Sequence, residues 1–360
     1  MKKIKVFITI PNLSAGGAEK VMTFLAKNIN RKKFETTLIV IGKQENSAYD
    51  TTDINIKYLG NLHVRNSIFP LIKLIRKEKP NIVLGSISHL NTILGLISFI
   101  FKKTAFIGRE TIVSSVQDEF YNKTSLKSKL FSIITKIGYK GLNYFISQSE
   151  DMKAEMINVK GIPNYKITTI NNPASDNFQA KLKIPPYNDC FKLITVGRLV
   201  KQKGHARILE VLSNFKQPFI YTIIGDGEEK EYILKLAEEL NIIDKIKHIP
   251  FTKNVNNYLS DSHLYLQGSY VEGFPNALIE SLAVGTPAIV YAAPGGINEI
   301  MKKYENGFIA TNKIEFREYM LEVLENIENY QPSKVSQWVT NAYNSQKIIQ
   351  NYEDFFTKVS

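Results

Sequence analysis

Two glutamates that lie eight positions apart, Glu272 and Glu280, flank the start of a predicted helix. Pro275 suits the first turn of that helix because its missing N–H has no intrahelical partner there, and Gly285 is expected to end the helix. The backbone amides of residues 274–277 then lie at the positive end of the helix dipole, where phosphate or sugar hydroxyls bind. The spacing therefore predicts one carboxylate on a loop, one on the helix, and an anion site between them.

A second group of polar residues is the pair of cations Arg198 and Lys203, which follows a predicted strand at Lys192–Val196. A guanidinium offers a fork of donors and an ammonium offers a compact charge, a combination suited to a diphosphate. Because Arg198 directly follows a buried strand, its charge needs a partner. We therefore favour ligand binding over a solvated surface position for both cations.

A pair of glycines, Gly16 and Gly17, follows the first predicted strand, Ile4–Ile10, and precedes a predicted helix at Ala18–Asn28. Glycines at a helix start allow a tight turn and let a ligand approach the backbone. A plain connecting turn would use the same residues. The pattern is not the Gly-x-Gly-x-x-Gly dinucleotide fingerprint, so a nicotinamide or flavin site is not indicated.

Short apolar runs typical of buried parallel strands alternate with helical patterns along the chain. The first series of strands is expected at Ile4–Ile10, Thr37–Ile41, Ile82–Gly85, Ala105–Gly108 and Tyr144–Ser147. The second series is expected at Lys192–Val196, Phe219–Ile224, Lys247–Phe251, Leu264–Gln267 and Ala288–Tyr291. Repeated strand–helix units predict an α/β protein with two doubly wound parallel sheets, whose ligands bind at the carboxyl ends of the strands. The glutamates, the cations and the glycine pair all follow predicted strands.

The length of the chain favours two domains, because 360 residues exceed the usual size of a single core. Polar, proline-marked segments at 172–176 and 185–189 indicate the linker. We expect a first domain at 1–175, joined by a C-terminal helix at about 340–360, and a second domain at 176–339. The end of the chain reads as one helix over Lys334–Phe356. A single cysteine, Cys190, excludes an intramolecular disulfide and fits a reducing compartment.

Charge is unevenly distributed between the two halves. Residues 1–175 hold 26 Lys and Arg against 12 Asp and Glu, whereas the remainder holds 20 against 22. The segment 123–140 alone carries five lysines and no acid, with apolar residues along one face of a predicted helix. Such a helix either packs on the core or lies on an anionic membrane. The basicity of the whole domain favours the membrane, and the expected contacts are Lys123, Lys127, Lys129 and Lys136.

Taken in order, several motifs resemble the retaining glycosyltransferases of family 4. They are Gly16-Gly17-x-Glu19, Gly197-Arg198 with Lys203-Gly204, the two-glutamate stretch 272–280, and Gly285-Thr286-Pro287. The resemblance covers most of the chain and is strongest from residue 191 to about 310. It implies the GT-B fold, in which two Rossmann-like domains face each other across a cleft. It also implies transfer of a hexose or N-acetylhexosamine from a nucleotide-sugar donor, usually a UDP-sugar.

The resemblance further implies roles for the residues that contact the nucleotide. Arg198 and Lys203 would bind the donor diphosphate, with Gly16 and Gly17 near it, and Glu280 would hold the ribose hydroxyls. Leaving-group departure puts negative charge on the β-phosphate, and two fixed cations would stabilise that charge. The sequence contains no Asp-x-Asp. We therefore expect no metal and no cofactor, the UDP-sugar being a substrate.

Other matching residues are implied to lie near the transferred sugar. Glu272 would contact the sugar, and the backbone of Phe274, Pro275 and Asn276 would support the sugar and phosphate. We expect Glu272 to stabilise the oxocarbenium-like sugar or its hydroxyls rather than to attack as a nucleophile. His89, which follows the strand predicted at Ile82–Gly85, matches a first-domain histidine that often lies near the sugar in this family. A hydrogen-bonded loop histidine would give the same pattern.

The acceptor is expected to be a polyprenyl-diphosphate-linked saccharide used in cell-surface polysaccharide synthesis. This places the protein in the cytoplasm, peripherally associated with the inner face of the cell membrane. Two other functions remain open. A UDP-sugar epimerase has the same two-domain fold and also binds UDP, but it needs no acceptor. A nucleic-acid-binding protein would explain the charge, yet the sequence has no recognisable reading motif, and we expect no nucleic-acid partner.

Overall fold

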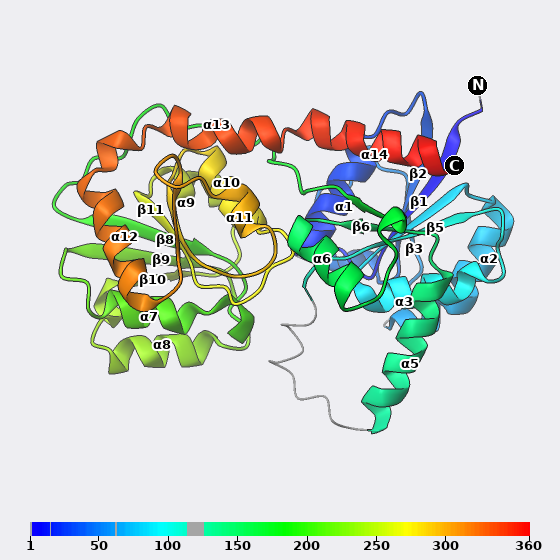
Figure 1. Cartoon of the computed structure of the whole chain (residues 1–360), viewed down its shortest axis with the longest axis horizontal. Helices are drawn as coiled ribbons and strands as arrows, with labels where there is room; N and C mark the ends of the chain where they lie inside the picture. Colours follow the sequence, from blue (N-terminus) through cyan, green and yellow to red (C-terminus); the bar gives the residue numbers. More distant parts are fainter. Residues whose placement is uncertain (1, 15, 62, 114–125) are drawn as a thin grey trace. The chain divides into compact units, whose positions relative to one another are not determined.

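The computed structural model describes residues 2–14, 16–61, 63–113 and 126–360. The chain divides into two compact units, each an α/β sheet with its own apolar core (Figure 1). Unit 1 comprises Met1–Thr111, Asn122–Asn172 and Gln346–Ser360. Unit 2 comprises Ile112–Tyr121 and Pro173–Ser345.

In unit 1 the described residues form a seven-stranded parallel sheet with strand order β3-β2-β1-β4-β5-β6-β7. The strands are β1 (Ile4–Ile10), β2 (Phe34–Val40), β3 (Ile56–Tyr58), β4 (Ile82–Ser86), β5 (Ala105–Arg109), β6 (Tyr144–Ser147) and β7 (Ile167–Thr169). The chain proceeds outward from β1 to β3 and then returns to β4 on the other side of β1. This reversal makes the carboxyl ends of β1 and β4 the place where such sheets bind ligands.

The helices of unit 1 surround this sheet, and the N-terminal part of α5 projects away from it (Figure 1). They are α1 (Gly17–Asn28), α2 (Ile68–Glu78), α3 (Ser88–Ser98), α5 (Leu126–Gly141), α6 (Glu150–Asn158) and the C-terminal α14 (Ser345–Val359). α14 joins the core through Phe356, whose ring meets that of Phe34 edge-on at 6.1 Å. α3 and α5 approach so closely that a Cβ on Gly95 would lie 1.8 Å from the Gly138 carbonyl oxygen.

In unit 2 the described residues form a six-stranded parallel sheet with strand order β10-β9-β8-β11-β12-β13. The strands are β8 (Phe191–Val196), β9 (Phe219–Ile224), β10 (Ile246–Ile249), β11 (Leu264–Gln267), β12 (Ala288–Tyr291) and β13 (Gly307–Ala310). The helices are α7 (His205–Leu212), α8 (Lys230–Glu239), α9 (Val255–Ser260), α10 (Asn276–Ala283), α11 (Ile297–Ile300), α12 (Lys313–Glu325) and α13 (Pro332–Ala342). The chain reverses here between β8 and β11, so their carboxyl ends form the second expected site.

The predicted pair of doubly wound parallel sheets is confirmed, and each predicted apolar run overlaps a strand. Two details of the prediction are wrong. The single helix expected over Lys334–Phe356 is interrupted between α13 and α14, where the Tyr343 carbonyl accepts from the Ala174 amide at 2.8 Å. Pro275 precedes the first turn of α10 as its N-cap, in extended backbone, instead of lying within it.

Candidate active site

The site in unit 2 is built from two segments that follow neighbouring strands. β8 is followed by residues 197–204, which include the short 3₁₀ helix Lys201–Lys203, and then by α7. β11 is followed by the loop 268–272, which leads to α10. Because β8 and β11 pair directly, with Leu193 opposite Leu264, the two segments meet at the carboxyl edge of the sheet.

At the centre of this edge Lys203 and Glu272 form an ion pair. The Lys203 ammonium lies 2.7 and 2.8 Å from the two oxygens of the Glu272 carboxylate. Glu272 is only 6% exposed, and the Ser269 hydroxyl donates to its Oε1 at 2.5 Å. A buried carboxylate is costly unless it is paired and hydrogen-bonded, and Lys203 with Ser269 meet both needs.

The loop that carries Glu272 is hydrogen-bonded at every residue to the segment after β8. Arg207 donates to the carbonyls of Gly268, at 2.6 Å, and of Ser269. Gln202 accepts from the Tyr270 amide at 2.9 Å and donates through its side chain to the Val271 carbonyl at 2.9 Å. Lys203 completes the series at Glu272. The position of the carboxylate is thus fixed by residues 202–207.

Arg207 is itself held between two aromatic rings. Its guanidinium carbon lies 4.0 Å from the ring centroid of Tyr270 and 3.9 Å from that of Tyr291. Partial burial lowers the pKa of Arg207, which the tyrosines partly offset. Stacked cation–π contacts of this kind hold a planar guanidinium in one orientation.

On its other side Glu272 is fixed by the loop after β12. The Glu272 amide donates to the Pro294 carbonyl at 2.9 Å. Gly295, at φ +114°, packs so tightly that a Cβ there would lie 2.2 Å from the Glu272 carbonyl oxygen. Only glycine fits such a contact at such a backbone angle. Contacts with the segment after β8 and with the loop after β12 therefore fix the position of Glu272.

A small cavity adjoins the ion pair and the start of α10. Its lining comprises Thr195, Val196, Gly197, Lys203, His205, Tyr265, Gln267, Gly268, Ser269, Glu272, Pro275, Asn276 and Ala277. Four of the predicted site residues, Lys203, Glu272, Pro275 and Asn276, are therefore brought together around one cavity. The cation, the carboxylate and the helix start can all act on a ligand bound there.

Three other predicted residues of unit 2 lie outside that lining. Arg198 is exposed and adjoins Gly197, which does line the cavity. The Phe274 ring is buried against Tyr343, with their ring centroids 5.1 Å apart, so only its backbone remains for ligand contact. Glu280 lies half-buried in the second turn of α10.

The remaining predicted residues belong to unit 1. Gly16 is the N-cap of α1, in extended backbone at φ −151°. This is ordinary extended backbone, and a Cβ there would lie 2.2 Å from a carboxylate oxygen of Glu19, the end of a flexible side chain that can shift. Gly17 is the first residue of α1.

His89 lies in the first turn of α3, at the carboxyl edge of the unit 1 sheet, where its side chain is exposed. Partial desolvation lowers the pKa of His89, which favours the neutral imidazole. The turn before it is unusual, because Ile87 has φ +85° although it is β-branched. The Ile87 amide donates to the Arg109 carbonyl at 3.3 Å.

The predicted membrane-facing lysines lie on or before α5. Lys123 falls outside the described residues, and the description of α5 side chains begins at residue 132, beyond Lys127 and Lys129. Lys136 is exposed. Ile133 and Ile137, which share its helix, are 55% and 45% exposed, so this apolar face is not packed on the unit 1 core.

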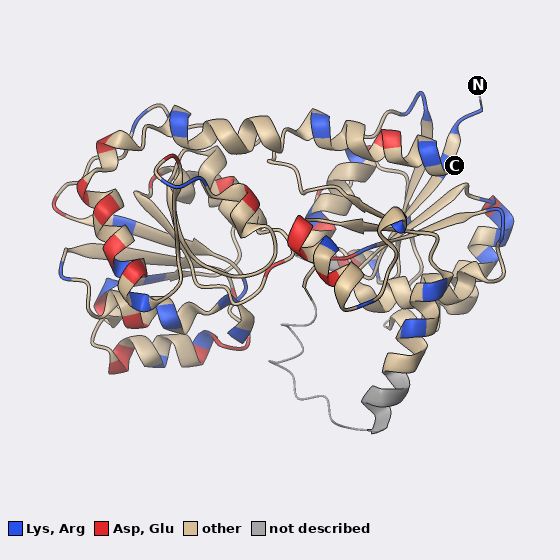
Figure 2. Ribbon diagram, viewed as in Figure 1, with Lys and Arg blue, Asp and Glu red and all other residues tan. Residues whose placement is uncertain are grey.

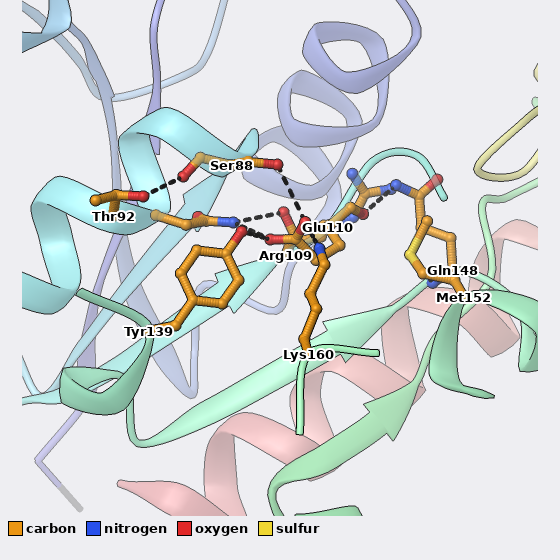
Figure 3. Close-up of polar contacts among 9 residues, drawn as sticks. Ser88, Thr92, Arg109, Glu110, Tyr139, Gln148, Met152 and Lys160 are labelled. Atoms are coloured by element: carbon orange, nitrogen blue, oxygen red, sulfur yellow. Dashed lines mark hydrogen bonds and ion pairs between the residues drawn. The ribbon is translucent and has the colours of Figure 1, made fainter. Parts of the chain in front are cut away.

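One cluster at the carboxyl edge of unit 1 was missed by the sequence analysis. Glu110, which follows β5, is fully buried (Figure 3). Its carboxylate accepts from Ser88, Asn91, Tyr139 and Lys160 at 2.7–3.1 Å. Burial alone would raise its pKa, but the Lys160 charge and these hydrogen bonds hold the pKa of Glu110 below its usual value. An acid directly after a buried strand was the available signal, because such a charge needs a partner.

The described residues contain neither a metal-binding cluster nor a membrane-spanning helix. Among them, no group of three or more His, Cys, Asp or Glu side chains is placed to hold a metal ion. No helix in the described part of the chain is long and apolar enough to cross a bilayer.

The chain is similar to known glycosyltransferases along its whole length. The family model "Glycosyl transferases group 1" matches residues 176–345, and the model "Glycosyltransferase Family 4" matches residues 15–177. An uncharacterized glycosyltransferase of Haemophilus influenzae is 27% identical, over 98% of this chain and 99% of its own. An N-acetylgalactosaminyltransferase of Campylobacter jejuni, whose name specifies a diphospho-undecaprenol-linked acceptor, is 26% identical over 86% of each chain.

Solved structures share the fold at lower identity. The Anabaena protein HepE in complex with UDP-glucose superposes with a TM-score of 0.84 over 99% of this chain and 100% of its own, at 14% identity. The apo form of the lipopolysaccharide outer core galactosyltransferase WaaB gives a TM-score of 0.76 at 17% identity, over 99% of this chain and 100% of that one.

Proposed function

Because the chain belongs to glycosyltransferase family 4, with the GT-B fold and bacterial relatives in polysaccharide synthesis, we propose that it transfers a sugar from a UDP-linked donor to a lipid-linked saccharide. The observation that carries the proposal is the Lys203–Glu272 pair, fixed beside the start of α10 at the switch point of unit 2. The donor is a UDP-hexose or UDP-N-acetylhexosamine, and the anomeric configuration is retained.

The donor assignment rests on the chemistry of the cavity wall. Lys203 supplies a cation, and the backbone amides at the start of α10 supply donors at the positive end of a helix dipole. A diphosphate beside them would find its charge matched, with the exposed Arg198 adjoining. The HepE structure contains UDP-glucose, which supports uridine nucleotides among the possible donors.

In the proposed reaction an acceptor hydroxyl oxygen forms a bond to the anomeric carbon, and the bond from that carbon to the β-phosphate oxygen breaks. UDP leaves with the bonding electrons, and the hydroxyl proton is released. Lys203 and Arg198 stabilise the charge that develops on the leaving phosphate. Glu272, freed from Lys203 as the phosphate takes over that cation, holds the sugar and offsets the positive charge that develops on its ring.

The acceptor assignment rests on the Campylobacter relative and on the surface of unit 1. The name of that relative specifies a saccharide on diphospho-undecaprenol. In this chain the described side chains of α5 combine exposed Ile133 and Ile137 with Lys136 and Lys140, without an acid (Figure 2). Such a helix suits an anionic membrane surface, where a lipid-linked acceptor lies. We place the protein at the cytoplasmic face of the cell membrane.

The experiment is a screen of UDP-, GDP- and ADP-sugars by thermal shift, followed by transfer assays with the stabilising donor and lipid-linked saccharides. We expect UDP and one UDP-sugar to raise the melting temperature, because a ligand that binds only the folded state stabilises it. We also expect product only when acceptor is added. Conversion of UDP-GlcNAc without acceptor would instead identify an epimerase. Stabilisation by GDP- or ADP-sugars alone would contradict the UDP assignment.

A further inference from the structure

Two side chains in the cavity of unit 2 are buried with an unpaired polar atom. His205 and Gln267 are 2% and 3% exposed. Within the described residues, neither His205 Nδ1 nor Gln267 Nε2 has a hydrogen-bond partner. Both residues line the cavity that also contains Lys203 and Glu272. Buried polar atoms in folded proteins are nearly always paired, so the two together require an explanation.

The chemical character of each atom follows from its surroundings. His205 Nε2 lies 3.1 Å from the Arg198 carbonyl oxygen, and a carbonyl can only accept, so Nε2 carries the hydrogen. Burial lowers the pKa of His205 to about 4, which leaves the ring neutral at physiological pH. His205 Nδ1 is therefore an acceptor. Gln267 Nε2 belongs to an amide NH₂ group and is a donor.

One acceptor and one donor around the same space complement a group that can both donate and accept. The cavity offers about 30 Å³ to a water-sized group, roughly the room for one hydroxyl. We propose that it is the subsite for one hydroxyl of the donor sugar, which donates to His205 Nδ1 and accepts from Gln267 Nε2. This inference rests on the proposed function, and it adds a determinant of which sugar is accepted.

Other occupants fit the same space less well. A phosphate or an acetamido group is several times larger than one hydroxyl. A metal cation would meet the Lys203 ammonium, which already neutralises Glu272, and the NH₂ group of Gln267, which cannot coordinate it. The position recognised here is therefore a free hydroxyl, and an N-acetylhexosamine donor would have to carry its acetamido group at another carbon. A deoxy analogue would leave two buried partners unpaired, which is how polar pockets reject such analogues.

The test uses the full-length protein and the UDP-sugar that it binds best, together with its monodeoxy analogues. We expect one analogue to bind about 100-fold more weakly than the parent, while free UDP binds as before. In Gln267→Met and in His205→Phe the discrimination should fall to about tenfold, and in the double variant it should disappear. Asn256→Leu is the matched control, because Asn256 Oδ1 is also buried and unpaired but lies outside the cavity lining.

The outcomes separate the inference from the proposed function. Equal affinity for every deoxy analogue in the wild type, or unchanged discrimination in the double variant, would show that the cavity holds only water. A lower melting temperature with loss of UDP binding in both single variants would show a purely structural role and would also overturn the inference. If no UDP-sugar binds the wild type, the proposed function itself fails.

Discussion

Lys203 and Glu272 lie 69 residues apart in sequence, yet the Lys203 ammonium contacts both oxygens of the Glu272 carboxylate at 2.7 and 2.8 Å. The residue expected to bind the donor diphosphate and the residue expected to bind the sugar are thus partners of each other. The pair satisfies a carboxylate that would otherwise be buried alone. A donor that places a phosphate near Lys203 and a hydroxyl near Glu272 would replace each partner by a group of matching character.

Breaking this pair from either side should have unequal effects on stability. Lys203→Met leaves a buried carboxylate without a counter-charge, and the free energy of unfolding should fall by about 3 kcal/mol. Glu272→Gln leaves an ammonium whose side chain is 23% exposed and can reach water, so the loss should be nearer ~1 kcal/mol. The loss in free energy of unfolding in the double variant should be about 2 kcal/mol smaller than the sum of the two single losses.

Urea denaturation of the four proteins measures this coupling. The control cycle uses Lys192 and Asp261, which pair at 2.8 Å but have side chains 40% and 67% exposed. Their coupling should stay below about 1 kcal/mol, because water screens an exposed pair. If the losses in unfolding free energy at Lys203 and Glu272 were additive, the observed ion pair would contribute nothing to stability.

Arg207 should act on transfer through the loop that carries Glu272. In Arg207→Lys the ammonium cannot donate to both loop carbonyls and stack between Tyr270 and Tyr291. A shift of the loop by about 1 Å would lower kcat by roughly 10- to 100-fold. UDP affinity should remain unchanged if the nucleotide does not depend on this loop. Steady-state kinetics and UDP calorimetry give the two values. Arg317→Lys on α12 is the control, and equal kcat in both variants would refute the positioning role.

The Glu110–Lys160 pair predicts how stability depends on pH. The pKa of Glu110 is lowered in the folded protein, so its contribution is fully present above the unfolded value of about 4.3 and is lost as pH falls through the folded pKa. Glu110→Gln should cost about 3 kcal/mol near neutral pH. Its difference from the wild type should shrink below about pH 4.

Urea titrations at several pH values test this expectation. Glu150→Gln is the comparison, because Glu150 is 64% exposed and lies 3.8 Å from Lys153. Its effect should stay below about 1 kcal/mol at every pH. A cost of Glu110→Gln that did not change with pH would mean that the carboxylate charge is not what stabilises the cluster.

The exposed face of α5 predicts binding to anionic vesicles. Ile133→Asn with Ile137→Asn, or Lys136→Glu with Lys140→Glu, should reduce co-sedimentation about tenfold or more, since each pair removes apolar or electrostatic attraction. Ile220→Asn with Ile314→Asn is the control, because these residues are 46% and 62% exposed but belong to unit 2. Equal sedimentation of all variants with phosphatidylglycerol vesicles would exclude this face as the membrane contact.

The sequence predicted the sheets well because buried parallel strands are continuous apolar runs. It missed β3, β7 and β13, which are only three or four residues long and lie at or beside sheet edges. The break between α13 and α14 depends on contacts of Tyr343 with Ala174 and Phe274, which are distant in sequence. Local periodicity contains no information about such contacts.

In the candidate site, too, the sequence predicted what depends on local pattern and missed what depends on contacts distant in sequence. The rule that polar residues after strands meet at one edge found Lys203 and Glu272, because it needs only strand order. It could not show that they pair, that Arg207 and Gln202 hold the loop, or that His205 and Gln267 face one cavity. Those relationships arise from how α7 abuts the end of β11, where a Cβ on Gly204 would lie 1.9 Å from the Gly268 carbonyl oxygen.

The most direct test of the account is the rate of sugar transfer by Glu272→Gln and Lys203→Ala, measured with the UDP-sugar found in the screen and a lipid-linked acceptor. If the pair forms the donor site, both variants should lose at least 100-fold in kcat/KM while they remain folded. Glu238→Gln, an exposed change on α8, should transfer at the wild-type rate. Near-normal transfer by both Glu272→Gln and Lys203→Ala would contradict the account.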